Sequence, residues 1–369
     1  MAKFNDLPPM EEAAALPDTA AAQSAEEASQ AISAVAMRCG GCGAKVGSTV
    51  LSRALGELRP IDRDDILIGL HAPDDAAVLQ VPPGKSVVHT VDFFRAFIDD
   101  PYVFGQVAAN HSLGDVFAMG AEAQSATAVA TVPYGIESKV EDVVYQMMSG
   151  AVKVLNDAGC ALVGGHTGEG RELALGFAIN GLIDPDEVMS KGGLRAGDVL
   201  ILTKPVGTGT LFAAHARLAA KGRWIDSALA SMIQSNQAAA QCLHRHGAKA
   251  CTDVTGFGLL GHLTEMCEGS GLGATLESAK VPRLPNTDHY IAQDCSPGGT
   301  DRNFESYGHK IGPLTDAQRA LLCDPQTSGG LLVAVNPDEL AAFCTATSEL
   351  KLESFGELIE STEPLITVN

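Results

Sequence analysis

The 369-residue sequence has little of what several protein classes require. Aromatic residues make up 5% of the chain, with a single Trp, and no apolar run approaches the ~18 residues that span a bilayer. The N-terminus has no apolar segment of the kind found in signal peptides. Lys and Arg total 25 against 45 Asp and Glu, a formal charge of −20. The sequence therefore predicts a cytoplasmic globular protein that binds neither membranes nor nucleic acid through its overall field.

Several catalytic signatures are also missing. The sequence contains no HExxH zinc motif, no GxSxG nucleophile turn, no Walker A loop and no Rossmann GxGxxG loop after a strand. The nine Cys are odd in number, and only Cys39 and Cys42 form a CxxC pair. This pattern excludes a secreted disulfide framework and is a weak indication of zinc.

The length and the composition indicate two domains and a tail. Residues 1–37 contain 12 Ala with Glu, Ser and Gln, and such a segment buries too little apolar surface to fold alone. We therefore interpret residues 1–37 as a flexible tail or linker, which could join the chain to another domain. Strands and helices alternate after it, with a break at 185–195. The prediction is two mixed α/β domains, an N-terminal one at 38–188 and a C-terminal one at 194–369.

Hydrophobic periodicity predicts individual elements within these domains. A capping box at Ser138 and Glu141 predicts the start of a helix that ends near Gly159. Residues 161–163 predict a strand that ends in a tight glycine turn at 164–166. The further predictions are strands at 172–180, 198–203 and 331–335, and helices at 110–120, 227–246 and 257–268.

A glycine-rich segment at 38–45 carries a candidate nucleophile. Glycines flank Cys42, so its thiol is unshielded, and Lys45 lies close enough in sequence to favour the thiolate. The alternative is an inert Cys in a flexible loop.

Isolated acidic residues form the second candidate set. Asp75 precedes a strand, Asp92 follows an apolar strand, Asp115 lies on an otherwise apolar helix, and Asp253 lies between an apolar run and a glycine turn. Several carboxylates around one pocket would suit Mg²⁺ bridging a triphosphate, although each Asp alone could be a cap or turn residue. Glycine-rich turns at 164–170, 207–209, 298–300 and 329–330 could cradle phosphates, a weak signal when taken singly.

Taken in order, these motifs resemble one family. The chain is similar to the selenophosphate synthetases, within the larger family of aminoimidazole-ribonucleotide-synthetase-like ATP enzymes. The resemblance covers residue 38 to the C-terminus. Its nine segments are 41–45, 74–78, 90–94, 110–120, 164–166, 202–205, 252–263, 297–303 and 323–331.

The resemblance implies a role for each matching residue. It makes Cys42 and Lys45 the catalytic pair, on a mobile arm that closes over the nucleotide. It implies Mg²⁺ and phosphate ligation by four carboxylates, those of Asp75, Asp92, Asp115 and Asp253. It implies nucleotide contacts from Lys45, Asp74, Asp92, Asn110, Asp115, Gly165, His166 and Thr167.

The resemblance also implies a reaction and an assembly. ATP, selenide and water would give selenophosphate, AMP and phosphate. N-terminal domains of a homodimer would form a β-barrel at their interface, where ATP would lie. K⁺ is a candidate further cofactor, and a selenium-delivery protein is a candidate partner. The sequence departs from the family at Ala44, where many relatives carry a second Cys, and in its long tail.

Two alternatives differ in chemistry. Another ATP enzyme of the same larger family, such as a purine-pathway ligase, a thiamine monophosphate kinase or a hydrogenase-maturation dehydratase, would share the Asp-rich site. The hydrogenase-maturation dehydratase needs a C-terminal Cys, whereas this chain ends in Asn369. The Cys42–Lys45 arm distinguishes this chain from the ligase and the kinase. A non-catalytic ATP- or selenide-binding regulator would need no such arm.

Overall fold

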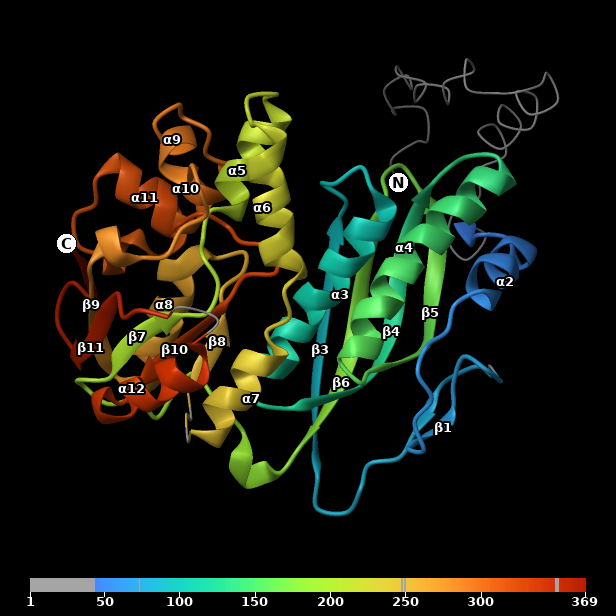
Figure 1. Cartoon of the computed structure of the whole chain (residues 1–369), viewed down its shortest axis with the longest axis horizontal. Helices are drawn as coiled ribbons and strands as arrows, with labels where there is room; N and C mark the ends of the chain where they lie inside the picture. The colour runs from blue at the N-terminus through green and yellow to red at the C-terminus, as the bar shows by residue number, and fades with distance from the viewer. Residues whose placement is uncertain (1–43, 73, 247, 249, 349–351) are drawn as a thin grey trace, which may run out of the picture.

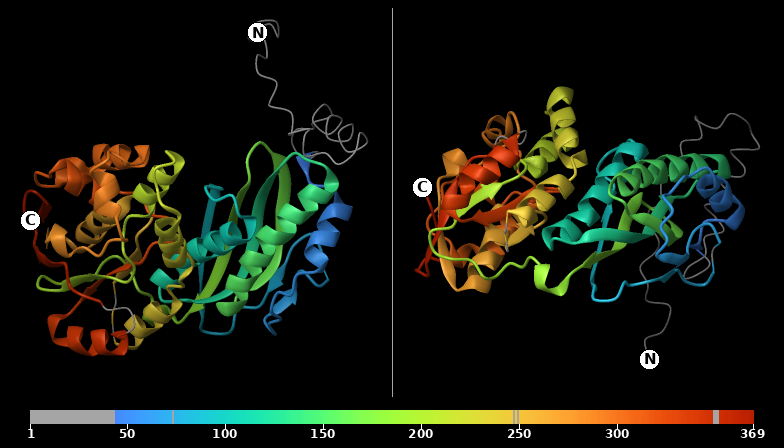
Figure 2. Two further views of the ribbon diagram at one scale, coloured as in Figure 1. Left: turned by 45° about the horizontal axis from the view of Figure 1, so that its top comes forward. Right: turned by 60° about the horizontal axis from the view of Figure 1, so that its bottom comes forward.

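The computed structural model of the chain describes residues 44–72, 74–246, 248, 250–348 and 352–369. Two mixed α/β domains lie side by side, with one helix, α3, at their junction (Figures 1 and 2). No helix in the described ranges combines the length and the apolar character needed to cross a bilayer.

The N-terminal domain is built on a four-stranded sheet in the order β3-β6-β4-β5. Its larger elements follow one another as β3 (Ser86–Arg95), α3 (Pro101–Ala118), β4 (Glu122–Pro133), α4 (Glu137–Asp157), β5 (Ala161–Gly170) and β6 (Ala174–Ile183). Helix α2 (Ser48–Gly56) and the short pair β1 (Ile66–Ile68) and β2 (Val78–Leu79) precede them. β4 and β5 are parallel and joined through α4, whereas β6 is antiparallel to both of its neighbours.

Helices α3 and α4 pack closely on one face of this sheet (Figure 1). A Cβ atom on Gly105 would lie 1.9 Å from the Met147 carbonyl oxygen, and one on Gly150 would lie 2.0 Å from that of Tyr102. Both helices therefore need glycine at their contact. α3 is apolar on nearly every side, as expected for a helix buried between a sheet and a second domain.

The other face of the sheet carries apolar side chains that stay exposed. Val87, Val91 and Phe93 alternate along β3 with half-buried residues that face the helices, and Val91 is 62% exposed. Val129 on β4 adds to this surface. The four strands form an open sheet in the single chain, so the barrel expected at a dimer interface would need a second protomer.

The C-terminal domain contains a six-stranded sheet in the order β12-β9-β11-β7-β10-β8, antiparallel except between β12 and β9. Its strands are β7 (Val199–Leu202), β8 (Cys251–Asp253), β9 (Leu272–Leu276), β10 (Leu331–Val335), β11 (Gly356–Glu360) and β12 (Ile366–Val368). Its helices are α5 (Thr208–Ala216), α6 (Gly222–Ile233), α7 (Gln237–Arg245), α8 (Gly258–Ser270), α9 (Thr287–Ile291), α10 (Gly298–Tyr307), α11 (Asp316–Leu322) and α12 (Pro337–Ala346). Short 3₁₀ turns lie at Pro185–Glu187, Ser278–Lys280 and Gly308–Lys310.

Three of the local predictions are wrong. The α4 helix begins at Glu137, one residue before Ser138, so Ser138 lies inside the helix and does not cap it. Residues 164–166 continue β5 instead of turning, because pairing with β4 carries the strand through its glycines with a register shift. The helix predicted at 227–246 is two helices, α6 and α7, interrupted at Ser235. The helix predicted at 110–120 is the second half of α3, which begins nine residues earlier at Pro101. The other strands and helices occur where predicted, within a few residues at their ends.

One apolar core crosses between the domains. It joins residues of α3 and α4 to Ile201, Leu243, Val333 and Phe343 of the C-terminal domain. A second core lies under α8 and the C-terminal sheet. We call the interface between the two domains, with α3 and the adjoining part of β3 on one side and the facing C-terminal residues on the other, the seam. Because continuous apolar burial holds the seam together, the groups that face each other across it have fixed relative positions.

The connection between β8 and α8 is held by a buried histidine. The His262 Nε2 atom accepts a hydrogen bond from the Thr255 amide, at 3.1 Å. Burial lowers the pKa of His262 to about 4, because protonation would charge a buried ring.

This gives a prediction for the pH dependence of stability. The folded-state pKa lies below the unfolded value, so the stabilisation present above pH 6.5 should be lost as the pH falls toward 4. The total should be on the order of 3 kcal/mol. His262→Gln keeps an acceptor near the Nε2 position and does not titrate. Urea unfolding between pH 7.5 and 5 should therefore show a smaller loss for His262→Gln than for wild type. The exposed His289→Gln is the control, and equal losses in all three proteins would contradict the role of His262.

Candidate functional site

A cavity of about 330 Å³ lies in the N-terminal domain between α2, α4 and strands β4 and β5. Its inner wall is apolar. Its polar lining comes from Asp74, Asp75, Gly164, Gly165 and Thr167, and from Thr127 of β4. Five residues from two predicted segments thus line one cavity, and four of them (Asp74, Asp75, Gly165 and Thr167) are predicted site residues.

Glycine at 165 follows from the packing of β5 on β4. A Cβ atom there would lie 2.5 Å from the Ala128 carbonyl oxygen, too close for any side chain. Gly165 and the adjoining His166 are nevertheless solvent-exposed. The Asp74 carboxylate accepts from the Asp75 amide at 2.8 Å, whereas the exposed Asp75 carboxylate has no partner within the described chain. The wall of the cavity therefore offers uncovered backbone and a free carboxylate to a ligand.

The start of the described chain runs along the same strand. Lys45 forms an antiparallel bridge with Gly168 of β5, and the Val46 amide donates to the Thr167 carbonyl oxygen at 3.1 Å. The Lys45 side chain is exposed. Lys45 is thus held next to the strand that lines the cavity. Cys42 and Cys39 lie outside the described residues.

A second group of predicted residues lies at the seam. The Thr90 hydroxyl on β3 donates to the Asp115 carboxylate at 2.5 Å, and Asp92 lies two residues along the same strand. Asp253 approaches from the C-terminal domain at the end of β8. A Cβ atom on Gly114 of α3 would lie 2.8 Å from the Asp253 Oδ2 atom, so any other residue there would require the carboxylate to move away from α3. The seam therefore gathers three carboxylates from β3, α3 and β8.

Burial and repulsion by its neighbours perturb the Asp253 carboxylate. Asp253 is 7% exposed. Burial raises its pKa, the neighbouring Asp115 and Asp92 carboxylates raise it further, and His111 opposes them. Burial likewise lowers the pKa of Lys204 to about 7 on the same side of the seam. Each shift favours the neutral form, the expected response when charge is buried without a full set of partners.

The seam carboxylates have the chemistry of a divalent-cation site. Hard oxygen donors that repel one another would be neutralised by Mg²⁺. Within the described chain no three His, Cys, Asp or Glu side chains converge tightly enough to form a complete metal cage. Mg²⁺ at phosphate-transfer sites is commonly held by one or two carboxylates together with water and substrate phosphates, so a complete cage is not required. The residues present therefore fit Mg²⁺ that is shared with a phosphate ligand.

The seam and the cavity are separate. Asp92 pairs with Phe177, Phe177 with Ala128, and Ala128 with Gly165, so one transverse row of the sheet joins the two places. Three strand spacings of ~4.8 Å place the backbones of Asp92 and Gly165 roughly 14 Å apart. A ligand that contacts both must be elongated, as a nucleoside triphosphate is. Asp75 belongs to the cavity and not to the seam.

Asn110 contacts neither the cavity residues nor the seam carboxylates. It is buried on α3, and its amide donates to the Ile233 carbonyl oxygen at 2.7 Å across the seam. Three residues at the seam were missed as site candidates, His111, Lys204 and Ser328. Their segments match the family, but a sequence does not show which groups they contact across the seam.

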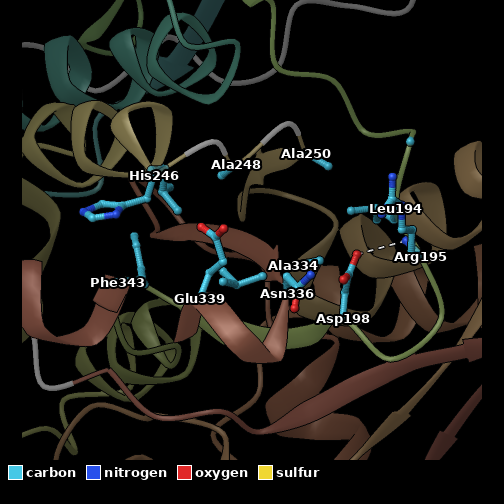
Figure 3. A pocket seen from close by; sticks show the side chains of 13 residues that line it. Leu194, Arg195, Asp198, His246, Ala248, Ala250, Ala334, Asn336, Glu339 and Phe343 are labelled. Carbon is cyan, nitrogen blue, oxygen red and sulfur yellow. Dashed lines mark hydrogen bonds between the residues drawn. The ribbon is translucent and has the colours of Figure 1, made fainter. Parts of the chain in front are cut away.

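A cavity of about 260 Å³ in the C-terminal domain is lined by none of the predicted site residues. Its rim carries Arg195, Asp198, His246 and Glu339 around an apolar floor (Figure 3). The Asp198 carboxylate accepts from the Arg195 amide at 2.9 Å, which closes one side of the rim.

Comparison with known proteins places the chain in a class. The models of the AIR synthase related protein N-terminal and C-terminal domains match residues 73–183 and 195–368. A thiamine-monophosphate kinase structure from Stenotrophomonas maltophilia shares the fold, with a TM-score of 0.65 and 20% identity, over 87% of this chain and 94% of that one. The chain is thus an AIR synthase related protein in both of its domains.

Curated relatives narrow this class. A selenide, water dikinase from Pseudomonas putida is 44% identical over 325 residues, covering 87% of this chain and 93% of the relative. One from Yersinia pestis is 41% identical over 321 residues, covering 86% and 92%. The chain belongs to the selenide, water dikinase family.

The repulsion at the seam predicts an unusual effect on stability. In Mg²⁺-free buffer at pH 8, Asp253→Asn should raise the melting temperature by at least ~2 °C, because the nearly isosteric amide removes a buried charge beside Asp115 and Asp92. Differential scanning fluorimetry measures this. Asp226→Asn, at an exposed position on α6, should leave the melting temperature unchanged. A destabilised Asp253→Asn protein would show that the carboxylate is satisfied without a cation.

Proposed function

We propose that the chain is a selenophosphate synthetase that converts ATP, selenide and water to selenophosphate, AMP and phosphate. One observation carries this proposal. In a member of the selenide, water dikinase family, Lys45 is paired with β5 next to a cavity rimmed by Asp74 and Asp75. This arrangement supports a catalytic arm that works at a nucleotide site.

The nucleotide would bind along the cavity and extend toward the seam. Asp74, Gly165, His166 and Thr167 are the proposed contacts at the cavity, and Asp92 and Asp115 those at the far end. The roughly 14 Å separation between these places suits the length of a triphosphate. The buried amide of Asn110 would act on the site indirectly, through its bond across the seam.

Mg²⁺ would be held by Asp75 at the cavity and by Asp92, Asp115 and Asp253 at the seam. When bound, Mg²⁺ would supply most of the positive charge that neutralises the phosphates, because the chain itself carries a net charge of −20. Thr90 fixes one Asp115 oxygen, so the other oxygen would face the ligand. The absence of a side chain at Gly114 lets the Asp253 carboxylate lie close enough to α3 to share the cation with Asp115.

Cys42 and Lys45 would act on the selenium. Selenide is a soft anion and needs positioning and a nearby positive charge more than a general base. The Lys45 ammonium would hold the anion and neutralise the transferring phosphoryl group. Cys42, three residues before Lys45, would lie on the same arm.

A homodimer is proposed through the open face of the N-terminal sheet. Contiguous exposed apolar side chains on a soluble protein commonly mark an interaction surface. Two four-stranded sheets that meet through Val87, Val91, Phe93 and Val129 would close into the barrel inferred from the sequence.

The remaining assignments concern the location, the domain bounds and further partners. The described cysteines are all free, which agrees with a cytoplasmic location. The segment between β6 and β7 contains only a short 3₁₀ turn and links the two sheets, which supports domains at 38–188 and 194–369. K⁺ as a cofactor, a selenium-delivery partner and a tail at 1–37 that joins another domain remain proposals from the family resemblance.

Phosphorus NMR of a reaction with ATP, Mg²⁺ and selenide tests the proposed activity. The expected products are selenophosphate, AMP and phosphate, with ATP consumption that depends on selenide. ATP consumption without selenide, giving ADP, would favour another kinase of the AIR synthase related class. Binding of ATP without turnover in the presence of selenide would favour a non-catalytic regulator.

The proposed arm predicts different outcomes for its residues. Cys42→Ser should bind Mg·ATP as wild type does but form no selenophosphate, and Lys45→Ala should also form none. Cys39→Ser is the matched control and should keep most activity, because it lies outside the Gly-Cys-Gly-x-Lys frame. Calorimetry and phosphorus NMR measure the two steps. If Cys39 were essential and Cys42 dispensable, Cys39 would be the nucleophile. If Cys42→Ser lost ATP binding, the arm would have a structural role and not a catalytic one.

The proposed dimer predicts an effect of charge on the open sheet face. Val91→Asp should convert the dimer to a monomer, because it would bury a carboxylate in the apolar interface. Light scattering coupled to size exclusion measures the mass. Leu218→Asp, at a position 93% exposed in the C-terminal domain, is the control and should remain dimeric. A dimer retained by Val91→Asp would show that the open sheet face is not the interface.

A further inference from the structure

Two neighbouring residues of α3 bond directly to the C-terminal domain. Asn110 donates to Ile233, and the His111 Nδ1 atom accepts a hydrogen bond from the Ser328 amide at 2.9 Å. The His111 side chain is only 12% exposed, and the Phe94 ring packs edge-on against it at 5.0 Å. His111 is therefore held in one orientation between the domains.

The loop that donates to His111 is unusually constrained. Ser328 has a φ of 51°, in the left-handed region that non-glycine residues rarely occupy. Its carbonyl oxygen accepts from the Lys204 Nζ atom at 2.9 Å, and its hydroxyl donates to the Met232 carbonyl oxygen at 2.7 Å. Strained backbone of this kind persists only where surrounding contacts fix it, and it concentrates at functional sites. Every polar group of Ser328 is thus engaged, and one of them is bonded to His111.

This bond determines where the imidazole carries its proton. A backbone amide is always a donor, so the Nδ1 atom that accepts from Ser328 has no proton of its own. The proton of the ring is then on Nε2. This atom lies 3.7 Å from the Asp92 Oδ1 atom, too far for a hydrogen bond but close enough for the N–H dipole to attract the carboxylate. The Ser328 bond therefore orients a positive N–H edge toward Asp92.

We propose that His111 is a positioning residue that couples the Ser328 loop of the C-terminal domain to Asp92. This inference rests on the proposed function, in which Asp92 contacts Mg²⁺ and nucleotide. His111 itself would touch neither ligand. It holds the Asp92 carboxylate in place only while the two domains are docked at the seam. The bond between Ser328 and His111 would thus strengthen ligand binding at Asp92. By linkage, ligand binding at Asp92 must stabilise that bond by the same free energy.

Two variants separate the two contacts of the ring. The Asn side chain can place an acceptor near the Nδ1 position, so His111→Asn keeps the bond to Ser328 and loses the group that faces Asp92. The longer Gln side chain reaches the Nε2 position, so His111→Gln keeps a donor toward Asp92 and loses the acceptor for Ser328. The matched control is His244→Asn, because His244 also lies 3.7 Å from a carboxylate, that of Glu187, but on the surface.

Two measurements on the whole chain test the coupling. Calorimetry with Mg²⁺ and a non-hydrolysable ATP analogue gives the affinity, and hydrogen exchange gives the protection of the Ser328 amide. In wild type, the ligand should slow exchange at Ser328. His111→Asn should keep wild-type protection without ligand, lose the ligand-induced increase and bind Mg·nucleotide about ten-fold more weakly. His111→Gln should exchange about five-fold faster without ligand. His244→Asn should match wild type.

The outcomes distinguish this inference from the proposed function. If wild type binds Mg·nucleotide but His111→Asn keeps both the affinity and the ligand-induced protection, the coupling through His111 is wrong and the proposed function stands. If both variants lose affinity and protection equally, His111 is merely structural and the inference is overturned. If wild type binds no Mg·nucleotide, the proposed function and this inference fail together.

Discussion

The burial of the Asp253 carboxylate against the N-terminal domain is the constraint on which the site depends. A glycine at 114 allows the carboxylate to approach α3, next to Asp115 and within the influence of Asp92. The protein thus assembles like charges in a place that water reaches poorly, which is unfavourable without a counterion. A bound divalent cation would turn this repulsion into affinity. The same arrangement explains why a strongly acidic chain can be expected to bind a polyanion.

The domains can hold these charges together because the seam is mainly apolar. The core that surrounds α3 continues into the C-terminal domain through Ile201, Leu243 and Val333. The burial of this apolar core offsets the free-energy cost of burying the carboxylates. The side chains of Asn110 and His111 fix the alignment of the two domains through their hydrogen bonds. The cavity next to β5 needs no such support, since it lies within the N-terminal domain and its polar groups remain exposed. One part of the site therefore depends on domain docking and the other does not.

The sequence was most informative where a residue conflicts with its local pattern. Asp115 stands out because it interrupts an apolar helix, and the structure does place it on a buried helix with a bonded partner. The two α/β domains also follow from local periodicity. Gly164 and Gly165 were misread as a turn, because the pairing that keeps them in a strand comes from β4, more than thirty residues earlier. The separation of α6 from α7 was missed because an apolar helical pattern continues across the interruption.

The arrangement of the site could be predicted only in part. Asp74, Gly165 and Thr167, which the family resemblance assigns to the nucleotide, line one cavity, and Asp75 lies there with them instead of with the other three carboxylates. The division between cavity and seam depends on strand order and register, which no motif encodes. His111 and Ser328 lie in segments that match the family but are distant in sequence. A motif does not show their contact, because it depends on one hydrogen bond between the domains.

The central claim is that the seam carboxylates hold divalent cations shared with a nucleotide that extends from the cavity. Anomalous diffraction from crystals grown with Mn²⁺ and a non-hydrolysable ATP analogue tests it most directly. We expect manganese within bonding distance of the Asp92, Asp115 or Asp253 carboxylates and of the triphosphate, with the nucleotide reaching the cavity at Asp74 and Gly165. A nucleotide bound with its manganese elsewhere, and all three seam carboxylates free of metal, would contradict the claim.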